Sequence, residues 1–218
     1  MLHKITIVIG PLILLYAILS GLVTYKYLDK SAKIILWLVA LTFFVEQLAT
    51  FFAYKFHNTN YVYGLFNPIQ LYLILLYYNY SIDAFIDNNV AKITGVLSCC
   101  LGLVNYFIIQ SPEKMNNFFL LFESIIVIGF SLYAFYRMLL VDDDLLLTQQ
   151  PHFWYTSIFL FFWTITFFIW GLYDYMTITL GVGIGLVHSL LIIANVINYV
   201  GFGSVFLLTR KMKNANGK

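Results

Sequence analysis

The chain has 218 residues, of which 61% are hydrophobic and 10% are charged, and its formal net charge is +2. Its mean hydropathy of +0.86 exceeds what a water-soluble domain of this length needs. The basic residues lie at the ends of long apolar segments, where membrane insertion places them. This distribution argues against a nucleic-acid partner and predicts an integral membrane protein.

Seven apolar segments each have about the 20 residues that a helix needs to cross a bilayer. In chain order, the predicted spans cover residues 5–25, 34–54, 68–86, 93–109, 112–136, 153–173 and 182–208. They leave no room for a soluble domain. The sequence therefore predicts an all-α polytopic membrane helix bundle, with residues 1–218 forming one seven-helix transmembrane domain.

The positions of Lys and Arg predict the orientation of the bundle. Only three basic residues, Lys4, Lys55 and Lys114, fall at the N-terminus and in the even-numbered loops. The odd-numbered loops and the C-terminal tail hold the other nine: Lys26, Lys30, Lys33, Lys92, Arg137, Arg210, Lys211, Lys213 and Lys218. By the positive-inside rule, we expect the N-terminus outside and the C-terminus in the cytoplasm, in the inner (cytoplasmic) membrane.

Two proline motifs predict helix starts. In Asn67-Pro68-Ile69-Gln70, a capping Asn precedes a proline suited to the first turn, with Gln at the third helical position. Ser111-Pro112 has a simpler form of the same pattern. The third helix is therefore expected to begin at Pro68, with residues 61–66 forming an aromatic outer loop.

Ionisable side chains at membrane depth are costly and usually face the interior of a bundle. The predicted spans contain three of them: Glu46, Glu123 and His188. In the second span, Thr42, Glu46 and Thr50 recur every four residues, which places them on one face of a helix. We expect this face to contact protein.

Other polar or amphipathic side chains fall in the same outer half of the predicted bundle. We predict a polar pocket that opens to the outside and is lined by Glu46, Gln70, Asn105, Glu123, Trp163, His188 and Asn195. A buried polar network that only specifies helix pairing remains the alternative.

Enzymatic chemistry finds little support in the sequence. An intramembrane metal site needs several ligands at membrane depth, yet three of the four histidines lie at span ends: His3, His57 and His152. A retinal chromophore needs a lysine in the seventh helix, and residues 181–209 contain none. We therefore expect neither an enzyme nor a bound metal or cofactor.

Short motifs recur along nearly the whole chain: Glu46, Asn67-Pro68-Ile69-Gln70, Glu123-Ser124, Pro151-His152-Phe153-Trp154, and His188 with Asn195. Taken together, they resemble a family of small seven-helix integral membrane proteins of Bacteroidota. The resemblance implies the fold and an inner-membrane location, and no biochemical activity. Gln70 stands where the family pattern has Pro-x-Glu, which puts a third buried carboxylate in doubt.

The function favoured by these features is a sensory or ligand-binding module that acts through a partner. The expected partners are membrane lipid, an unidentified small-molecule ligand and a cytoplasmic or membrane protein, with oligomerisation left open. One alternative is a small proton-linked transporter or channel component that uses Glu46 and Glu123. The other is a structural or assembly accessory.

Overall fold

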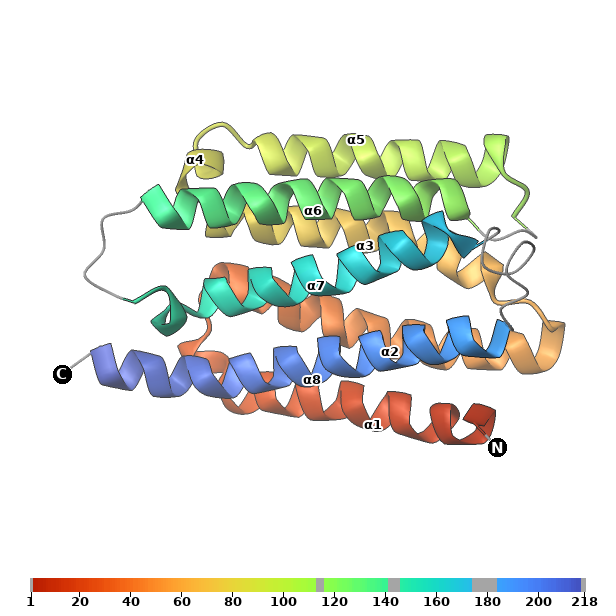
Figure 1. Ribbon diagram of the computed structural model, residues 1–218, viewed down its shortest axis with the longest axis horizontal. Helices are drawn as coiled ribbons and strands as arrows, with labels where there is room; N and C mark the ends of the chain where they lie inside the picture. Colours follow the sequence, from red (N-terminus) through yellow and green to blue (C-terminus); the bar gives the residue numbers. More distant parts are fainter. Residues whose placement is uncertain (1, 113–115, 141–145, 174–183, 217–218) are drawn as a thin grey trace.

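The computed structural model describes residues 2–112, 116–140, 146–173 and 184–216. Within these ranges the chain is helical and contains no strand. Its long helices lie side by side in a bundle, with α1 starting at one end and α8 finishing at the other (Figure 1). The long helices are α1 (Leu2–Val23), α2 (Lys30–Phe56), α3 (Asn60–Ser81), α5 (Val90–Val104), α6 (Asn117–Leu140), α7 (Pro151–Gly171) and α8 (Ile184–Asn216).

Short helical turns join some of the long helices. A 3-10 turn at Tyr25–Tyr27 follows α1, and another at Leu147–Gln149 precedes α7. The single-turn helix α4 (Asp83–Ile86) separates α3 from α5, and a π-helical segment (Asn105–Ile109) continues α5.

Among the described residues, five helical segments are long and apolar enough to cross a membrane: Lys30–Phe56, Val90–Ile109, Asn117–Leu140, Pro151–Gly171 and Gly185–Met212. They support the assignment as a membrane protein. The apolar segment Ile9–Val23 of α1 is shorter, and α3 is not among the five. Seven crossings and the orientation of the termini therefore stay predictions.

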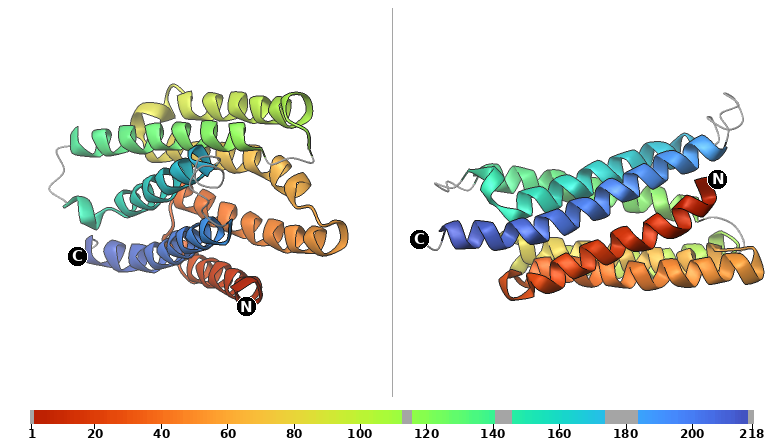
Figure 2. Two further views of the ribbon diagram at one scale, coloured as in Figure 1. Left: turned by 45° about the vertical axis from the view of Figure 1, so that its right-hand side comes forward. Right: turned by 90° about the horizontal axis from the view of Figure 1, so that it is seen from below.

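The bundle has two sides that α7 connects. Helices α1, α2 and α8 lie on one side and α3, α5 and α6 on the other, with α7 between α6 and α8 (Figures 1 and 2). The two sides also meet where α2 packs against α3. Aromatic side chains fill much of the centre, and those with almost no exposed surface are Tyr77, Tyr78, Tyr155, Phe159, Phe202 and Phe206.

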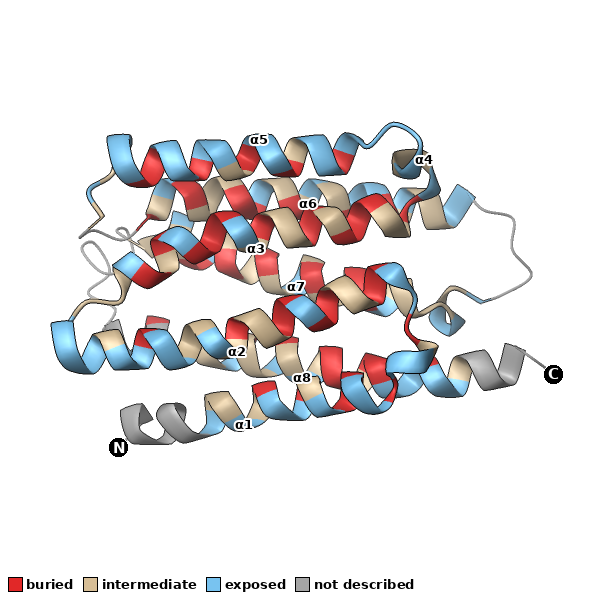
Figure 3. Cartoon of the chain, turned by 180° about the vertical axis from the view of Figure 1, so that it is seen from behind, coloured by how far each residue is buried: buried red, intermediate tan, exposed pale blue. Residues whose placement is uncertain are grey.

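The outer surface of the bundle is strongly apolar. Buried residues face neighbouring helices, while many exposed residues lie on the outward faces (Figure 3). On α2, for example, Trp37 and Phe44 are 66% and 69% exposed. Large apolar side chains in water would be unfavourable over so wide an area, whereas lipid chains solvate them well.

The predicted start of the third helix is wrong. Helix α3 begins at Asn60, so Asn67 and Pro68 lie in its interior and are buried, and residues 61–66 are helical rather than a loop. Pro68 packs against Gly102 of α5, and Gly64 packs against the ring of Tyr106. These contacts with the α5 segment favour a continued helix over the local capping signal.

The predicted boundaries of two other segments also change. Helix α6 begins at Asn117 rather than at Pro112, and Asn116 accepts the first backbone hydrogen bond from Leu120. Helix α3 ends at Ser81 because Ile82 is extended, so the predicted span 68–86 lies too far along the chain.

Candidate functional site

Helices α2, α3, α7 and α8 surround a small cavity of about 10 Å³, which is roughly room for one water molecule. Its polar lining comes from Thr42, Gln70, Asn198 and Tyr199. The remaining wall is apolar, and its aromatic members are Phe159, Phe162, Trp163 and Phe202. Because these residues lie near the midpoints of their helices, the cavity is in the middle of the bundle rather than only in the predicted outer half.

Thr42 and Asn198 have unused hydrogen-bonding capacity at the cavity. The Thr42 hydroxyl donates to the Leu38 carbonyl at 2.8 Å, which leaves its oxygen lone pairs as acceptors. Asn198 is 5% exposed, and its Oδ1 has no hydrogen-bond partner among the described residues. A buried acceptor without a partner is costly, so a donor placed in the cavity would be stabilised.

Glu46 lies one helical turn from Thr42 and is half-buried. Its Oε2 accepts a hydrogen bond of 3.0 Å from the hydroxyl of Tyr63 on α3. Tyr199 of α8 lines the same cavity as Thr42. The carboxyl group of Glu46 is thus one helical turn from the cavity wall along α2.

The polar face predicted for the second helix is only partly in contact with protein. Thr42 is buried and Glu46 is half-buried, but Thr50 is exposed and donates to the Glu46 carbonyl of its own helix at 2.8 Å. Toward the end of α2, this face therefore points away from the neighbouring helices.

The structure brings Gln70 and Trp163 together in the cavity wall and places Glu46 beside it. Asn195 does not line the cavity, since it is on α8 with its Nδ2 donating to the Leu191 carbonyl at 3.0 Å. His188 belongs to α8, but its side chain lies outside the described residues.

Asn105 and Glu123 lie elsewhere. Asn105 begins the π-helical segment, and its Nδ2 donates to Gln110 Oε1 at 2.9 Å and to Asn116 Oδ1. Glu123 on α6 is completely buried, and neither carboxyl oxygen has a hydrogen-bond partner among the described residues. It is not part of the cavity wall.

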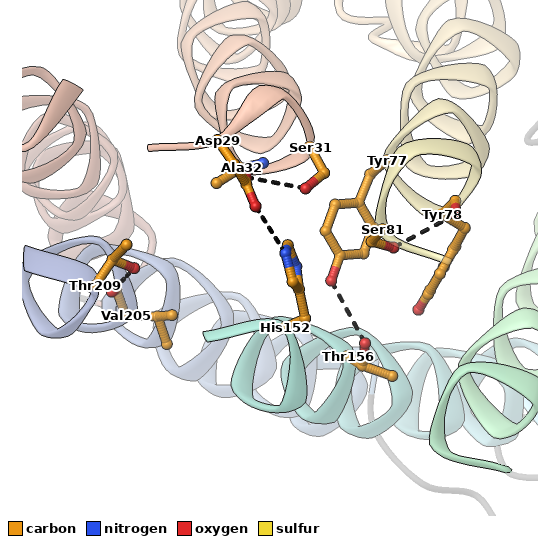
Figure 4. A network of polar contacts seen from close by, with 10 residues as sticks. All are labelled: Asp29, Ser31, Ala32, Tyr77, Tyr78, Ser81, His152, Thr156, Val205 and Thr209. Carbon is orange, nitrogen blue, oxygen red and sulfur yellow. Dashed lines mark hydrogen bonds and ion pairs between the residues drawn. The ribbon is translucent and has the colours of Figure 1, made fainter. Parts of the chain in front are cut away.

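A second polar site, which the sequence did not reveal, lies where α2 and α7 begin (Figure 4). Asp29 caps α2: its Oδ1 accepts from the Ala32 amide at 2.8 Å and from the Ser31 hydroxyl at 3.0 Å. Its Oδ2 lies 2.7 Å from His152 Nε2. Burial alone would raise the pKa of Asp29, but the interaction with His152 and the cap bonds together lower that pKa below its usual range.

This second site, made of Asp29 and His152, is connected to the cavity by aromatic packing. The buried Tyr77 of α3 has its ring centroid 6.0 Å from that of His152 and 5.5 Å from that of Phe159. The Tyr77 hydroxyl lies 3.4 Å from Thr156 Oγ1 (Figure 4). Phe159 lines the cavity, so a single ring separates the two sites.

The sequence contained partial signals for these residues. Asp29 directly precedes Lys30-Ser31-Ala32, an arrangement typical of a helix N-cap, and His152 follows Pro151 at a helix start. Their pairing depends on how α2 packs near α7, and no local sequence pattern predicts that packing. Tyr63, near the start of α3, was equally hidden, because tyrosines at helix ends are also typical of the membrane interface. Tyr199 lies near the middle of α8, where no local pattern distinguishes it from other aromatic residues of the core.

Comparison of the chain with protein-family models, with curated proteins and with solved structures gives no match.

Proposed function

We propose that the protein is a multi-pass inner-membrane protein that binds a small polar ligand inside its helix bundle and signals this binding to a protein partner. The observation that carries the proposal is the cavity between α2, α3, α7 and α8, where the polar groups of Thr42, Gln70 and Asn198 meet. A network that served only helix pairing would be expected to satisfy its buried groups, yet Asn198 Oδ1 has no partner among the described residues.

Seven crossings with a cytoplasmic C-terminus fit the placement of the basic residues. Lys30 and Lys33 near the start of α2 lie over the rings of Tyr80 and Tyr25, at 3.6 and 4.7 Å. Arg210 near the end of α8 lies over Tyr27 at 5.7 Å. Three cations thus share one end of the bundle with aromatic rings, as expected at a cytoplasmic interface.

The site of Asp29 and His152 offers a physical route from ligand to partner. Helices α2 and α7 both contribute to the cavity wall, through Thr42 and Trp163, and the Asp29–His152 interaction joins their starts at the proposed cytoplasmic end. A ligand that separates or tilts these helices changes this end of the bundle. A cytoplasmic or membrane protein in contact with it would detect the change.

The proposal is tested by thermal unfolding of the purified protein against a library of ions and of neutral polar molecules with one to a few heavy atoms, the size that the cavity admits. A true ligand raises the unfolding temperature of the wild type, because it binds only the folded state. We expect Gln70→Leu to abolish the shift and Gln47→Leu, at an exposed position of α2, to retain it. A ligand that stabilises wild type and Gln70→Leu equally binds elsewhere.

A small proton-linked transporter is the second candidate, favoured by the complete burial of Glu123 without a described partner. Ionisable residues within membrane helices often serve proton relays, and a carrier must bind and release its proton in turn. Reconstitution into liposomes tests this role. Proton-driven solute uptake that is lost in Glu123→Gln and Glu46→Gln would support transport over sensing.

A further inference from the structure

We propose that the cavity between α2, α3, α7 and α8 binds a small monovalent cation, of the size of sodium or ammonium. The proposal rests on the proposed ligand-binding function of this cavity and adds the chemical class of the ligand. Three properties of the lining support it: the hydrogen-bonding character of its polar atoms, its charge, and its aromatic surface.

Three of the polar side chains that line the cavity offer oxygen acceptors. The Thr42 proton is used by the Leu38 carbonyl, so the hydroxyl offers only lone pairs to the cavity. The Oδ1 of Asn198 is buried and has no partner among the described residues. Gln70 adds a second side-chain amide, whose oxygen also accepts. This oxygen-rich set suits a cation or a hydrogen-bond donor.

The charge around the cavity is negative or neutral. None of the lining residues is Lys, Arg or His. Among the described residues, Glu46 is an ionisable group one helical turn from Thr42 on α2, and it is not part of the lining itself. The few oxygens of this uncharged lining suit a small monovalent ion, whereas a calcium site draws on six to eight oxygens that include several carboxylates.

The aromatic wall and the size of the cavity further restrict which ligands can bind. Trp163 and Tyr199 line the cavity, and the faces of such rings attract cations. The volume of about 10 Å³ admits about one water-sized particle. Larger organic amines do not fit this arrangement of the helices.

The test uses the full-length protein in detergent or nanodiscs and measures thermal unfolding at constant pH and ionic strength. Sodium chloride or ammonium chloride is compared with the chloride of N-methyl-D-glucamine, a cation too large for the cavity. We expect one of the small cations to raise the unfolding temperature by about 3 °C or more, saturating with concentration.

Two substitutions and a control connect this shift to the cavity. Thr42→Val keeps the shape of the side chain but removes the oxygen, and Asn198→Leu removes the amide; both should lose the shift. Asn195→Leu, one turn away on α8 and outside the cavity wall, should keep it. Since each variant is compared with itself in N-methyl-D-glucamine, a change in its basal stability does not affect the result.

The possible outcomes distinguish a failure of the cation proposal from a failure of the cavity as a ligand-binding site. Equal unfolding temperatures in all the salts, or a cation effect that persists in Thr42→Val and Asn198→Leu, overturn the cation site. If a neutral polar molecule of similar size then stabilises the wild type but not Asn198→Leu, the proposed function survives without the cation. If no compound acts through the cavity, both proposals fail.

Discussion

Asp29 Oδ2 and His152 Nε2 lie 2.7 Å apart although 123 residues separate them in the chain. One residue caps α2 and the other lies in the first turn of α7, so a single contact fixes the relative position of two helices that line the cavity.

Removing the Asp29 carboxylate should destabilise the protein in two separable steps. Asn at this position keeps a good N-cap but loses the negative charge that faces His152, whereas Ala loses both. We expect Asp29→Ala to cost about 1 kcal/mol more than Asp29→Asn in the free energy of unfolding. Asp87→Asn, at an exposed position before α5, is the control and should be neutral.

A double-mutant cycle tests whether His152 is the partner that matters. If the contact accounts for the loss in Asp29→Asn, adding His152→Gln should cost little more, because the interaction is already gone. Additive losses would show that the two residues act independently.

Acidification should lower the free energy of unfolding, because it protonates Asp29. Its pKa is lowered in the folded state, so its contribution to stability is fully present above the unfolded pKa of about 3.9. That contribution is lost as the pH falls toward the folded pKa. We expect the stability difference between wild type and Asp29→Asn to shrink below about pH 5, as measured by thermal unfolding across pH. A difference that grows on acidification would contradict the assignment.

Sequence reasoning predicted the helical class for physical reasons, and it named two residues that the structure places together in the cavity wall. Long apolar segments have few stable solutions other than membrane helices, and a glutamine or tryptophan at membrane depth tends to face protein. Gln70 and Trp163 accordingly meet at the cavity. Their partners Asn198 and Tyr199 could not be ranked above similar residues without knowing which helices are neighbours.

The start of α3 shows why local signals failed. Asn67-Pro68 has the composition of a helix cap, but the contacts of Gly64 with Tyr106 and of Pro68 with Gly102 lie between segments distant in sequence. Such tertiary contacts override a capping preference of about 1 kcal/mol. The separation of Glu123 from Glu46 likewise depends on helix pairing, which spacing along each helix does not specify.

The Glu123 carboxyl group should contribute no net stability. It is completely buried, and neither oxygen has a partner among the described residues, so an apolar side chain of similar length avoids its desolvation cost. We expect Glu123→Met to raise the free energy of unfolding by about 1–3 kcal/mol. Glu46→Met should instead destabilise, because it leaves the Tyr63 hydroxyl without its acceptor.

This pair of variants also separates stability from function. A residue retained despite a stability cost is expected to serve an activity. Solute uptake lost in a more stable Glu123→Met protein would therefore favour the transporter. Retained ligand binding in the same variant would place Glu123 outside the sensory site, and a destabilised variant would show that the carboxyl group has a partner.

The close approach of α3, α5 and α6 depends on the absence of a side chain at Gly102. A Cβ there would lie 2.6 Å from Pro68 Cγ and 2.7 Å from Phe119 Cε2, and the proline ring cannot rotate away. We expect Gly102→Ala to destabilise the protein by about 1–3 kcal/mol, because the helices must move apart.

Gly129→Ala on α6 is the matched control. A Cβ at this position meets nothing within 4 Å. The higher helix propensity of Ala should therefore leave the stability unchanged or raise it by up to about 1 kcal/mol. Equal effects of the two substitutions in thermal unfolding would show that α3 and α5 do not pack through Pro68 and Gly102, and the internal position of Pro68 in α3 would lose its explanation.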